Sequence, residues 1–148
     1  QNKMLKRVTI QSFNWAVLEK VKTLNPKITT AALLGNKSGL PTESGDASPW
    51  TNRIHYNKVG QSSLGLLNAA KEYVDVFSPS GLIIVPITPE YMNSSVEEIQ
   101  LAGFPVIPWT INEKSHMKFI INLGVDGIIT DYPDRLIDLL KEMEIDIK

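Results

Sequence analysis

The sequence predicts an α/β protein in which short apolar strands alternate with amphipathic helices. Each of five segments rich in β-branched and aliphatic residues is followed by helical periodicity, and no hairpin signal separates any two of them. The expected strands are residues 8–13, 28–34, 74–79, 106–112 and 126–131. Such alternation is typical of a parallel sheet with right-handed crossovers. Two architectures remain open: five consecutive units of a (β/α)8 barrel of the TIM type, or an open five-stranded doubly wound parallel sheet.

The overall composition indicates a single globular domain over residues 1–148. A formal net charge of −1 at pH 7, without a basic stripe, argues against nucleic acid as a partner. Because the chain has no cysteine, it offers no disulfide framework and no thiolate nucleophile. We expect no transmembrane segment, since no apolar run approaches the roughly 20 residues that a membrane helix needs.

The periodicity of apolar residues predicts the first strand, the helix after it and the second strand. Residues 8–13 alternate β-branched and polar side chains, which favours a strand. Asn14 is a good N-cap for the helix that follows, and Pro26 ends it. Its apolar positions fall on one face of a 3.6-residue period: Val17, Leu18, Val21 and Leu24. Residues 28–34 are apolar enough to be covered on both faces of a sheet.

Segment 35–61 interrupts the alternation. It is polar, punctuated by glycine and proline, and longer than most loops inside compact domains. Because it follows a predicted strand, we interpret it as a long βα-loop insertion that leaves from the ligand face. A lid over the site and plain disorder are the two alternatives, and Trp50 and Tyr56 make full disorder harder to reconcile with the sequence.

The remaining units carry clear helix boundaries. Ser62 or Ser63 is the expected cap of one helix, and Ser94 or Ser95 that of the next, which ends with a left-handed cap at Gly103. A further helix runs from Glu113 to Gly124 with Met117, Ile120 and Ile121 inward. The final helix begins near Asp134.

The candidate site lies at the carboxyl ends of these strands, where parallel α/β sheets bind their ligands. The stretch Val-Ile-Pro-Trp-Thr-Ile-Asn at residues 106–112 delivers one large aromatic and several hydrogen-bonding groups there. We call the edge of the sheet formed by these carboxyl ends the rim. The substrate-binding candidates on it are Gln11, Phe13, Ser78, Trp109 and Asn112. Amide and hydroxyl groups beside an indole wall suit a neutral, hydroxyl-rich or aliphatic group.

Each candidate also has a structural interpretation. Trp109 fits a core position whose indole N–H finds a partner, Asn112 fits the N-cap of the following helix, and Ser78 fits a local turn. The rim offers one carboxylate, Asp131, and no histidine. We therefore predict no catalytic residue and no metal ligand set within this chain, since metal binding and acid-base chemistry need several converging groups.

Three stretches together resemble the C-terminal half of glycerophosphodiester phosphodiesterases. They are residues 8–15, residues 106–112, and the run Leu-Gly-Val-Asp-Gly-Ile-Ile-Thr-Asp-Tyr-Pro-Asp at residues 123–134, which is the most specific of the three. The resemblance covers nearly the whole chain outside segment 35–61. It implies a (β/α)8 barrel that hydrolyses glycerophosphodiesters to glycerol 3-phosphate and an alcohol, with Mg²⁺ or Ca²⁺ in the complete enzyme.

The family's catalytic motifs are absent from this sequence. The resemblance implies a His-Arg-Gly strand, a Glu-Leu-Asp metal strand, a second histidine and a Glu-x-Lys strand, and none of these occurs here. We therefore expect a substrate-binding wall that is inactive alone and whose partner is the N-terminal half of the same barrel or a second copy of the chain. The alternative function is a non-catalytic α/β module that binds a small molecule.

Overall fold

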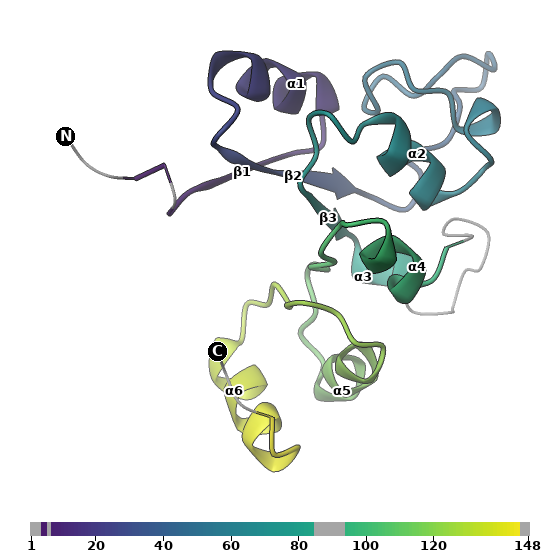
Figure 1. Cartoon of the computed structure of the whole chain (residues 1–148). Coiled ribbons are helices and arrows are strands. Elements are labelled where there is room, and N and C mark those ends of the chain that lie inside the picture. Colours follow the sequence, from purple (N-terminus) through teal and green to yellow (C-terminus); the bar gives the residue numbers. More distant parts are fainter. Residues whose placement is uncertain (1–3, 6, 85–93, 146–148) are drawn as a thin grey trace.

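The computed structural model describes residues 4–5, 7–84 and 94–145, and its helices follow one another along an arc beside the strands (Figure 1). The strands are β1 (Thr9–Ser12), β2 (Thr29–Leu34) and β3 (Val76–Pro79). The helices are α1 (Trp15–Leu24), α2 (Ser63–Ala69), α3 (Gly81–Ile84), α4 (Val96–Leu101), α5 (Lys114–Asn122) and α6 (Pro133–Glu142), with a 3-10 turn η1 (Tyr56–Lys58). The prediction of alternating strands and helices is confirmed, although the short α3 was not expected.

The three strands form a parallel sheet in the order β1-β2-β3. Gln11 of β1 lies opposite Ala31 of β2, and Ala31 lies opposite Val76 of β3. Since side chains alternate along a strand, these residues share one face of the sheet, and their neighbours in sequence share the other. None of the helices in the described part of the chain has the length and apolar content that a membrane crossing requires.

The last two predicted strands, residues 106–112 and 126–131, are extended without being regular strands, and we call them the fourth and fifth segments. Isolated parallel bridges join the fourth segment to β3. The amide of Ile129 in the fifth segment donates a hydrogen bond to the carbonyl of Pro108 (2.9 Å). Pro108 has no N–H, so the ladder between the two segments is interrupted there. Within the described residues, the five extended pieces still lie side by side in chain order.

The predicted helix boundaries are largely confirmed. The side chain of Asn14 caps α1 by accepting from the amide of Ala16, and the Ser62 side chain caps α2. Ser95 caps α4 in a reciprocal capping box with Glu98. Gly103 and Gly124 follow α4 and α5 with φ of 96° and 78°, the left-handed values expected of helix ends.

The predicted inner face of α1 is only partly right. Leu18 is fully buried, together with Trp15 at the start of the helix, whereas Val17 and Leu24 are 44% and 74% exposed. Residues 15 and 18 are one helical turn apart, so they meet the sheet as a pair. The Trp15 indole N–H donates to the carbonyl of Leu33 (3.1 Å), which orients this face of α1 toward β2.

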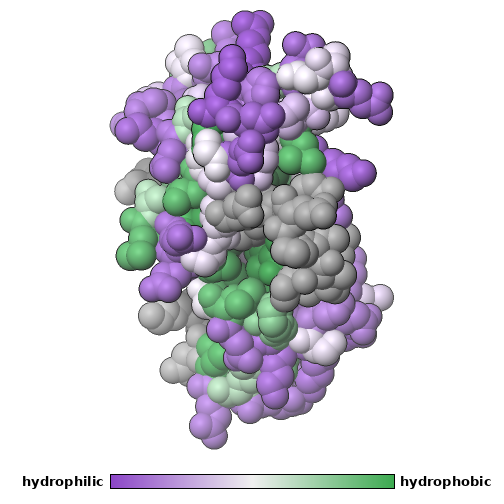
Figure 2. Space-filling view, turned by 90° about the vertical axis from the view of Figure 1, so that its right-hand side faces the viewer, coloured by the Kyte–Doolittle hydropathy of each residue, from purple (hydrophilic) through white to green (hydrophobic). Residues whose placement is uncertain are grey.

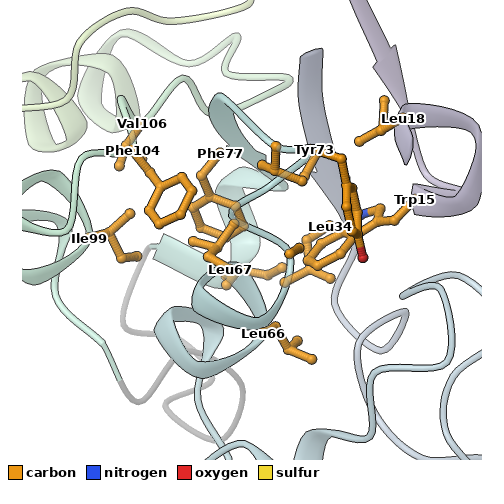
Figure 3. Packing of buried hydrophobic residues seen from close by; sticks show 14 of the residues in the cluster. Trp15, Leu18, Leu34, Leu66, Leu67, Tyr73, Phe77, Ile99, Phe104 and Val106 are labelled. Atoms are coloured by element: carbon orange, nitrogen blue, oxygen red, sulfur yellow. The ribbon is translucent and has the colours of Figure 1, made fainter. Parts of the chain in front are cut away.

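The core lies between the helices and one face of the sheet (Figure 3). Phe77 of β3 is fully buried among side chains of α1, α2 and α4. The labelled members of this cluster are Trp15, Leu18, Leu34, Leu66, Leu67, Tyr73, Phe77, Ile99, Phe104 and Val106. A second cluster joins Ile111 to the inner faces of α5 and α6 through Met117, Ile120 and Leu139. Both clusters belong to the helix-covered face, so the opposite face of the sheet has no helical cover among the described residues.

Segment 35–61 packs on the helical side of the sheet. Ser48, Thr51 and Tyr56 are buried within it. The carbonyl of Trp50 accepts a hydrogen bond from the amide of Trp15 (2.8 Å), which attaches the segment to the start of α1. The end of the molecule where it lies has a mostly hydrophilic surface, and hydrophobic residues gather toward the middle of the same view (Figure 2).

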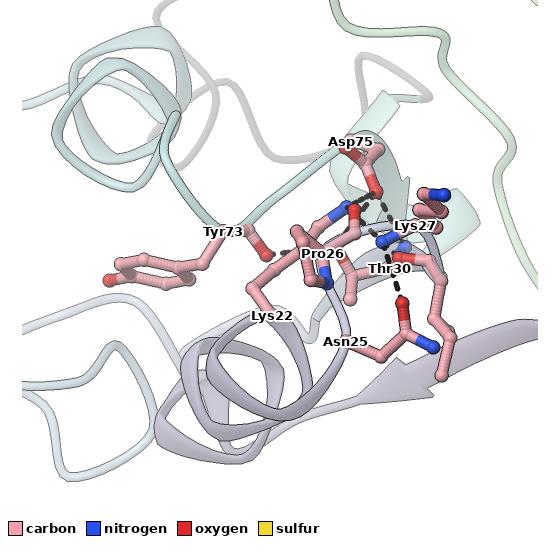
Figure 4. A network of polar contacts seen from close by, with 8 residues as sticks. Lys22, Asn25, Pro26, Lys27, Thr30, Tyr73 and Asp75 are labelled. Atoms are coloured by element: carbon pink, nitrogen blue, oxygen red, sulfur yellow. Dashed lines mark hydrogen bonds and ion pairs between the residues drawn. The ribbon is translucent and has the colours of Figure 1, made fainter.

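The amino ends of the strands are joined by a polar network around Asp75 (Figure 4). The Asp75 carboxylate accepts from Lys22 Nζ (2.5 Å) and from the backbone amide of Thr30 (2.8 Å), while the Asp75 amide donates to the Thr30 carbonyl (3.1 Å). Asp126 repeats this arrangement, because its carboxylate accepts from the amide of Val106 (2.7 Å) and its amide donates to the Val106 carbonyl (3.0 Å). Each aspartate thus fixes its own segment against the preceding one.

Asp75→Asn is expected to lower the free energy of unfolding at pH 7 by about 1 kcal/mol. Burial raises the pKa of the Asp75 carboxyl, but hydrogen bonds from Lys22 and Thr30 outweigh it and hold this pKa below the usual value. Since the folded pKa is the lower one, the stabilisation is complete above the unfolded pKa of about 3.9 and is lost as pH falls through the folded pKa. Urea unfolding of both proteins between pH 7 and pH 2.5 measures this difference.

The matched control is Asp138→Asn, whose carboxylate pairs with Lys141 at 3.4 Å on the exposed side of α6. This variant should unfold as the parent does at every pH, because such exposed pairs contribute little. A stability difference for Asp75→Asn that stays constant down to pH 2.5 would contradict the role given to its charge.

Candidate functional site

An open pocket of about 200 Å³ lies on the face of the sheet that the helices leave uncovered. Its walls come from β1, β2 and the fourth and fifth segments, near their carboxyl ends. The residues that line it are Gln11, Phe13, Leu33, Trp109, Thr110 and Ile129. None of the residues of segment 35–61 is among them, so this segment does not contribute a wall to this pocket.

An aromatic pair forms one wall of the pocket. The rings of Phe13 and Trp109 meet edge to face, with centroids 5.4 Å apart and an interplanar angle of 87°. Phe13 is 40% exposed, while Trp109 is half-buried. The Trp109 indole N–H donates to the carbonyl of Ser78 (2.8 Å), which fixes the plane of the indole. The pair presents a rigid apolar surface to whatever enters the pocket.

Ser78 supports this wall and does not line the pocket. It is 2% exposed, and its hydroxyl donates to the carbonyl of Ile107 (2.7 Å). Because its own carbonyl holds the Trp109 indole, Ser78 joins β3 to the fourth segment beneath the aromatic pair. The sequence-based expectation placed Ser78 on the rim; in the structure it is buried opposite Leu33 of β2 and is not among the residues that line the pocket.

Asn112 also bonds to protein groups near the pocket. Its side-chain amide donates to Asp131 Oδ2 (2.9 Å), and its amide oxygen accepts from Thr130 Oγ1 (3.1 Å) and the Asp131 backbone amide (3.0 Å). The N-cap of α5 is Glu113, so the structural interpretation of Asn112 as that cap is wrong. Asn112 ties the end of the fourth segment to the end of the fifth.

Two pocket residues were not anticipated from the sequence: Leu33 and Ile129. Leu33 lies two residues beyond Ala31, so strand alternation alone places it on the same face as Gln11. A systematic alternation count along each predicted strand would have found it. Ile129 could be found only once the register of the fifth segment against the fourth was known.

The side chains that line the pocket are apolar or neutral and polar. No side chain that lines it carries a charge, and its polar groups are the Gln11 amide and the Thr110 hydroxyl. Among residues 4–5, 7–84 and 94–145, no three histidine, aspartate or glutamate side chains come together. The donor set therefore does not fit a divalent metal, which requires several converging oxygen or imidazole ligands.

A parallel α/β sheet with helices on one face is the architecture of a TIM-barrel wall, and the structural neighbours of this chain are TIM-barrel enzymes. Residues 2–135 match the model of the "Glycerophosphoryl diester phosphodiesterase family". The chain belongs to this family, as the resemblance in its sequence indicated. The family is generally dependent on calcium or magnesium.

Individual relatives agree with this assignment. A glycerophosphodiester phosphodiesterase of Caldanaerobacter subterraneus subsp. tengcongensis is 29% identical over 136 residues, covering 92% of this chain and 43% of the relative. A putative glycerophosphoryl diester phosphodiesterase from Silicibacter pomeroyi DSS-3 superposes with a TM-score of 0.75 at 25% identity, covering 99% of this chain and 42% of that one. An Oleispira antarctica phosphodiesterase was solved in complex with the product sn-glycerol-3-phosphate. It superposes with a TM-score of 0.58 at 21% identity, covering 90% of this chain and 41% of that one. The chain spans less than half the length of these relatives.

Proposed function

We propose that this chain forms five consecutive β-α units in the C-terminal part of a glycerophosphodiester phosphodiesterase barrel. In this proposal it supplies the substrate-binding wall but not the metal and histidine catalytic set. The complete protein hydrolyses glycerophosphodiesters to glycerol 3-phosphate and an alcohol. The observation that carries the proposal is the uncharged aromatic pocket at the carboxyl ends of the sheet, in a chain of this family without the family's catalytic motifs.

The order of the strands supports a partial barrel over the alternative architecture. An open doubly wound sheet contains a reversal of strand order, and its ligand binds in the crevice that the reversal creates. The strand order β1-β2-β3, continued by the fourth and fifth segments, follows the chain without a reversal in the described residues. This order is typical of a barrel wall. Without a reversal there is no crevice of the kind in which a doubly wound module would bind its ligand, so the order argues against the alternative function.

The uncovered face of the sheet supports a partner that completes the barrel. Phe13 and Ile129 remain 40% and 36% exposed on this face, and the outer edges of β1 and the fifth segment have no neighbouring strand among the described residues. Burial of apolar surface is worth roughly 25 cal/mol per Å², so covering such a face is strongly favourable. We propose the N-terminal half of the same barrel as the partner, with a second copy of this chain as the competing occupant.

The pocket suits the uncharged part of a glycerophosphodiester. Gln11 offers amide hydrogen bonds, and Phe13 with Trp109 forms an apolar wall for a hydroxyl-rich or aliphatic group. The Oleispira antarctica phosphodiesterase binds sn-glycerol-3-phosphate. We propose that Gln11, Phe13 and Trp109 contact the substrate, while Ser78 and Asn112 shape the wall from behind. Any Mg²⁺ or Ca²⁺ would be held by the partner's residues.

The test combines the chain with the part of a glycerophosphodiester phosphodiesterase that it does not cover. This chain covers 43% of the Caldanaerobacter relative, and in this proposal the part left uncovered is the N-terminal portion of that relative. We expect the mixture, or a fusion of the two pieces, to release glycerol 3-phosphate from a glycerophosphodiester in the presence of Mg²⁺ or Ca²⁺. Sedimentation should show a one-to-one complex.

Each piece alone is the control, and both should be inactive with either ion. Hydrolysis by the isolated chain would contradict the assignment of catalysis to the other half. A correctly sized complex or fusion that hydrolyses no glycerophosphodiester with either ion would contradict the proposed function. A stable homodimer that excludes the N-terminal piece would replace the proposed partner with a second copy.

A further inference from the structure

Asn112 uses most of the hydrogen-bonding capacity of its side chain to connect two backbone segments. A side-chain amide has two donors and two acceptor positions, and three of these four are used, all on Thr130 and Asp131. The Thr130 hydroxyl also accepts from the amide of Tyr132 (3.0 Å), at the start of α6. The ends of the fourth and fifth segments are thus joined through one side chain.

Arg135, in the first turns of α6, holds the backbone of the same residue. Its guanidinium donates to the main-chain carbonyl of Asn112 and lies over the Tyr132 ring, 4.3 Å from the ring centroid. None of the three ion pairs found in the described residues includes Arg135. Its orientation is therefore set by a neutral carbonyl and an aromatic face, an arrangement that suits the planar guanidinium better than a lysine ammonium.

The groups that Arg135 and Asn112 hold are adjacent to the pocket wall. Thr110 lies two residues before Asn112, and Ile129 lies one residue before Thr130; both line the pocket. Between them, the amide of Ile111 donates to the carbonyl of Ile129 (3.0 Å). A shift of the Asn112 backbone is therefore transmitted to the two residues that form this side of the pocket.

We propose that Arg135 is a positioning residue that acts through Asn112 to keep Thr110 and Ile129 at the pocket wall. Arg135 is not among the residues that line the pocket, so its effect is on the geometry of the wall. The proposal rests on the proposed function only in taking the pocket as the substrate site. Small displacements of binding groups weaken productive binding strongly, so a residue that holds a pocket residue in place affects binding without touching the substrate.

The first test measures the geometry of the wall in the 148-residue chain. Arg135→Met keeps the length of the side chain and removes the guanidinium, while Arg135→Lys keeps a charge and one donor. We expect amide hydrogen exchange at Ile111 to accelerate at least tenfold in Arg135→Met, with a thermal midpoint within a few degrees of the parent. The Trp109 indole N–H resonance, assigned with Trp109→Phe, should shift or broaden. In Arg135→Lys, both the acceleration of exchange at Ile111 and the change in the Trp109 resonance should be smaller than in Arg135→Met.

The matched control is Arg53→Met, which removes an exposed guanidinium from segment 35–61 and should change neither signal. Unchanged exchange at Ile111 and an unchanged Trp109 indole resonance in Arg135→Met would overturn the inference. So would acceleration spread evenly over all core amides, because that result would show a general loss of stability.

The second test uses the completed barrel and separates binding from chemistry. Arg135→Met should raise KM for the glycerophosphodiester threefold to tenfold and leave kcat within twofold, since Arg135 does not touch the reacting atoms. Equal KM values for the parent and Arg135→Met would overturn the positioning role. An inactive barrel built with the parent chain would instead count against the proposed function, and the hydrogen-exchange result would remain valid on its own.

Discussion

Gly65→Ala is expected to destabilise the chain by about 3 kcal/mol or more. Gly65 is in α2, where alanine normally stabilises a helix by about 1 kcal/mol relative to glycine. Here a Cβ at residue 65 would lie 1.6 Å from the carbonyl oxygen of Val59 and 2.8 Å from its carbonyl carbon. The obstructing atoms are backbone, so no side-chain rotation relieves the overlap. Denaturant unfolding monitored by circular dichroism measures the loss.

Gly127→Ala is the matched control for this substitution. A Cβ at residue 127 would meet the Ile107 side chain at 3.5 Å, which is an ordinary van der Waals distance. This variant should unfold within about 1 kcal/mol of the parent. If Gly65→Ala proved as stable as Gly127→Ala, the close packing of α2 against the end of segment 35–61 would be contradicted.

Trp109→Ala in the completed barrel is expected to reduce kcat/KM for a glycerophosphodiester by tenfold or more. The substitution removes the indole wall and the edge-to-face contact with Phe13. Lost contacts in an apolar pocket cost about 1–3 kcal/mol, which corresponds to a ten- to hundredfold effect. Steady-state kinetics of release of the alcohol product measure the change, and circular dichroism checks that the fold is intact.

Trp109→Phe separates the wall from the hydrogen bond that orients it. Phenylalanine keeps a smaller aromatic surface beside Phe13 and loses the donation to the carbonyl of Ser78. We expect the kcat/KM of Trp109→Phe to be higher than that of Trp109→Ala. A Trp109→Ala barrel with unchanged kcat/KM would remove this residue from the substrate site.

Local patterns were sufficient to predict most of the secondary structure. Asn14 and Ser95 precede apolar periodic runs, and their side chains accept from the first free amides of α1 and α4. Such boundaries depend on a few neighbouring residues, so they can be predicted from one sequence. The buried face of α1 could not, because the sheet contacts Trp15 and Leu18 while leaving Val17 exposed. Which apolar side chains a helix buries depends on how the helix lies across its neighbours.

The sequence predicted which strand ends lie together, but only in part which side chains there line the pocket. Trp109 and Phe13 both follow from strand ends that meet at one edge, and the structure brings their rings together. Ser78 lies at a strand end too, yet its hydroxyl and carbonyl bond to neighbouring segments beneath the rim. Asn112 likewise bonds to Asp131 instead of opening toward the pocket. Distinguishing a ligand group from a support requires the register between strands that are distant in the sequence.

The paired aspartates at the amino ends of the segments have a consequence for how this fold can vary. Asp75 and Asp126 each clamp the amide and carbonyl of one residue on the preceding segment, far from the pocket. These two pairs of neighbouring segments are thereby aligned at the amino end of the sheet, opposite to the end where the pocket lies. The fourth and fifth segments are therefore held at both ends, by Asp126 at the amino end and by Asn112 at the carboxyl end, so a substitution at either end leaves one of the two connections in place.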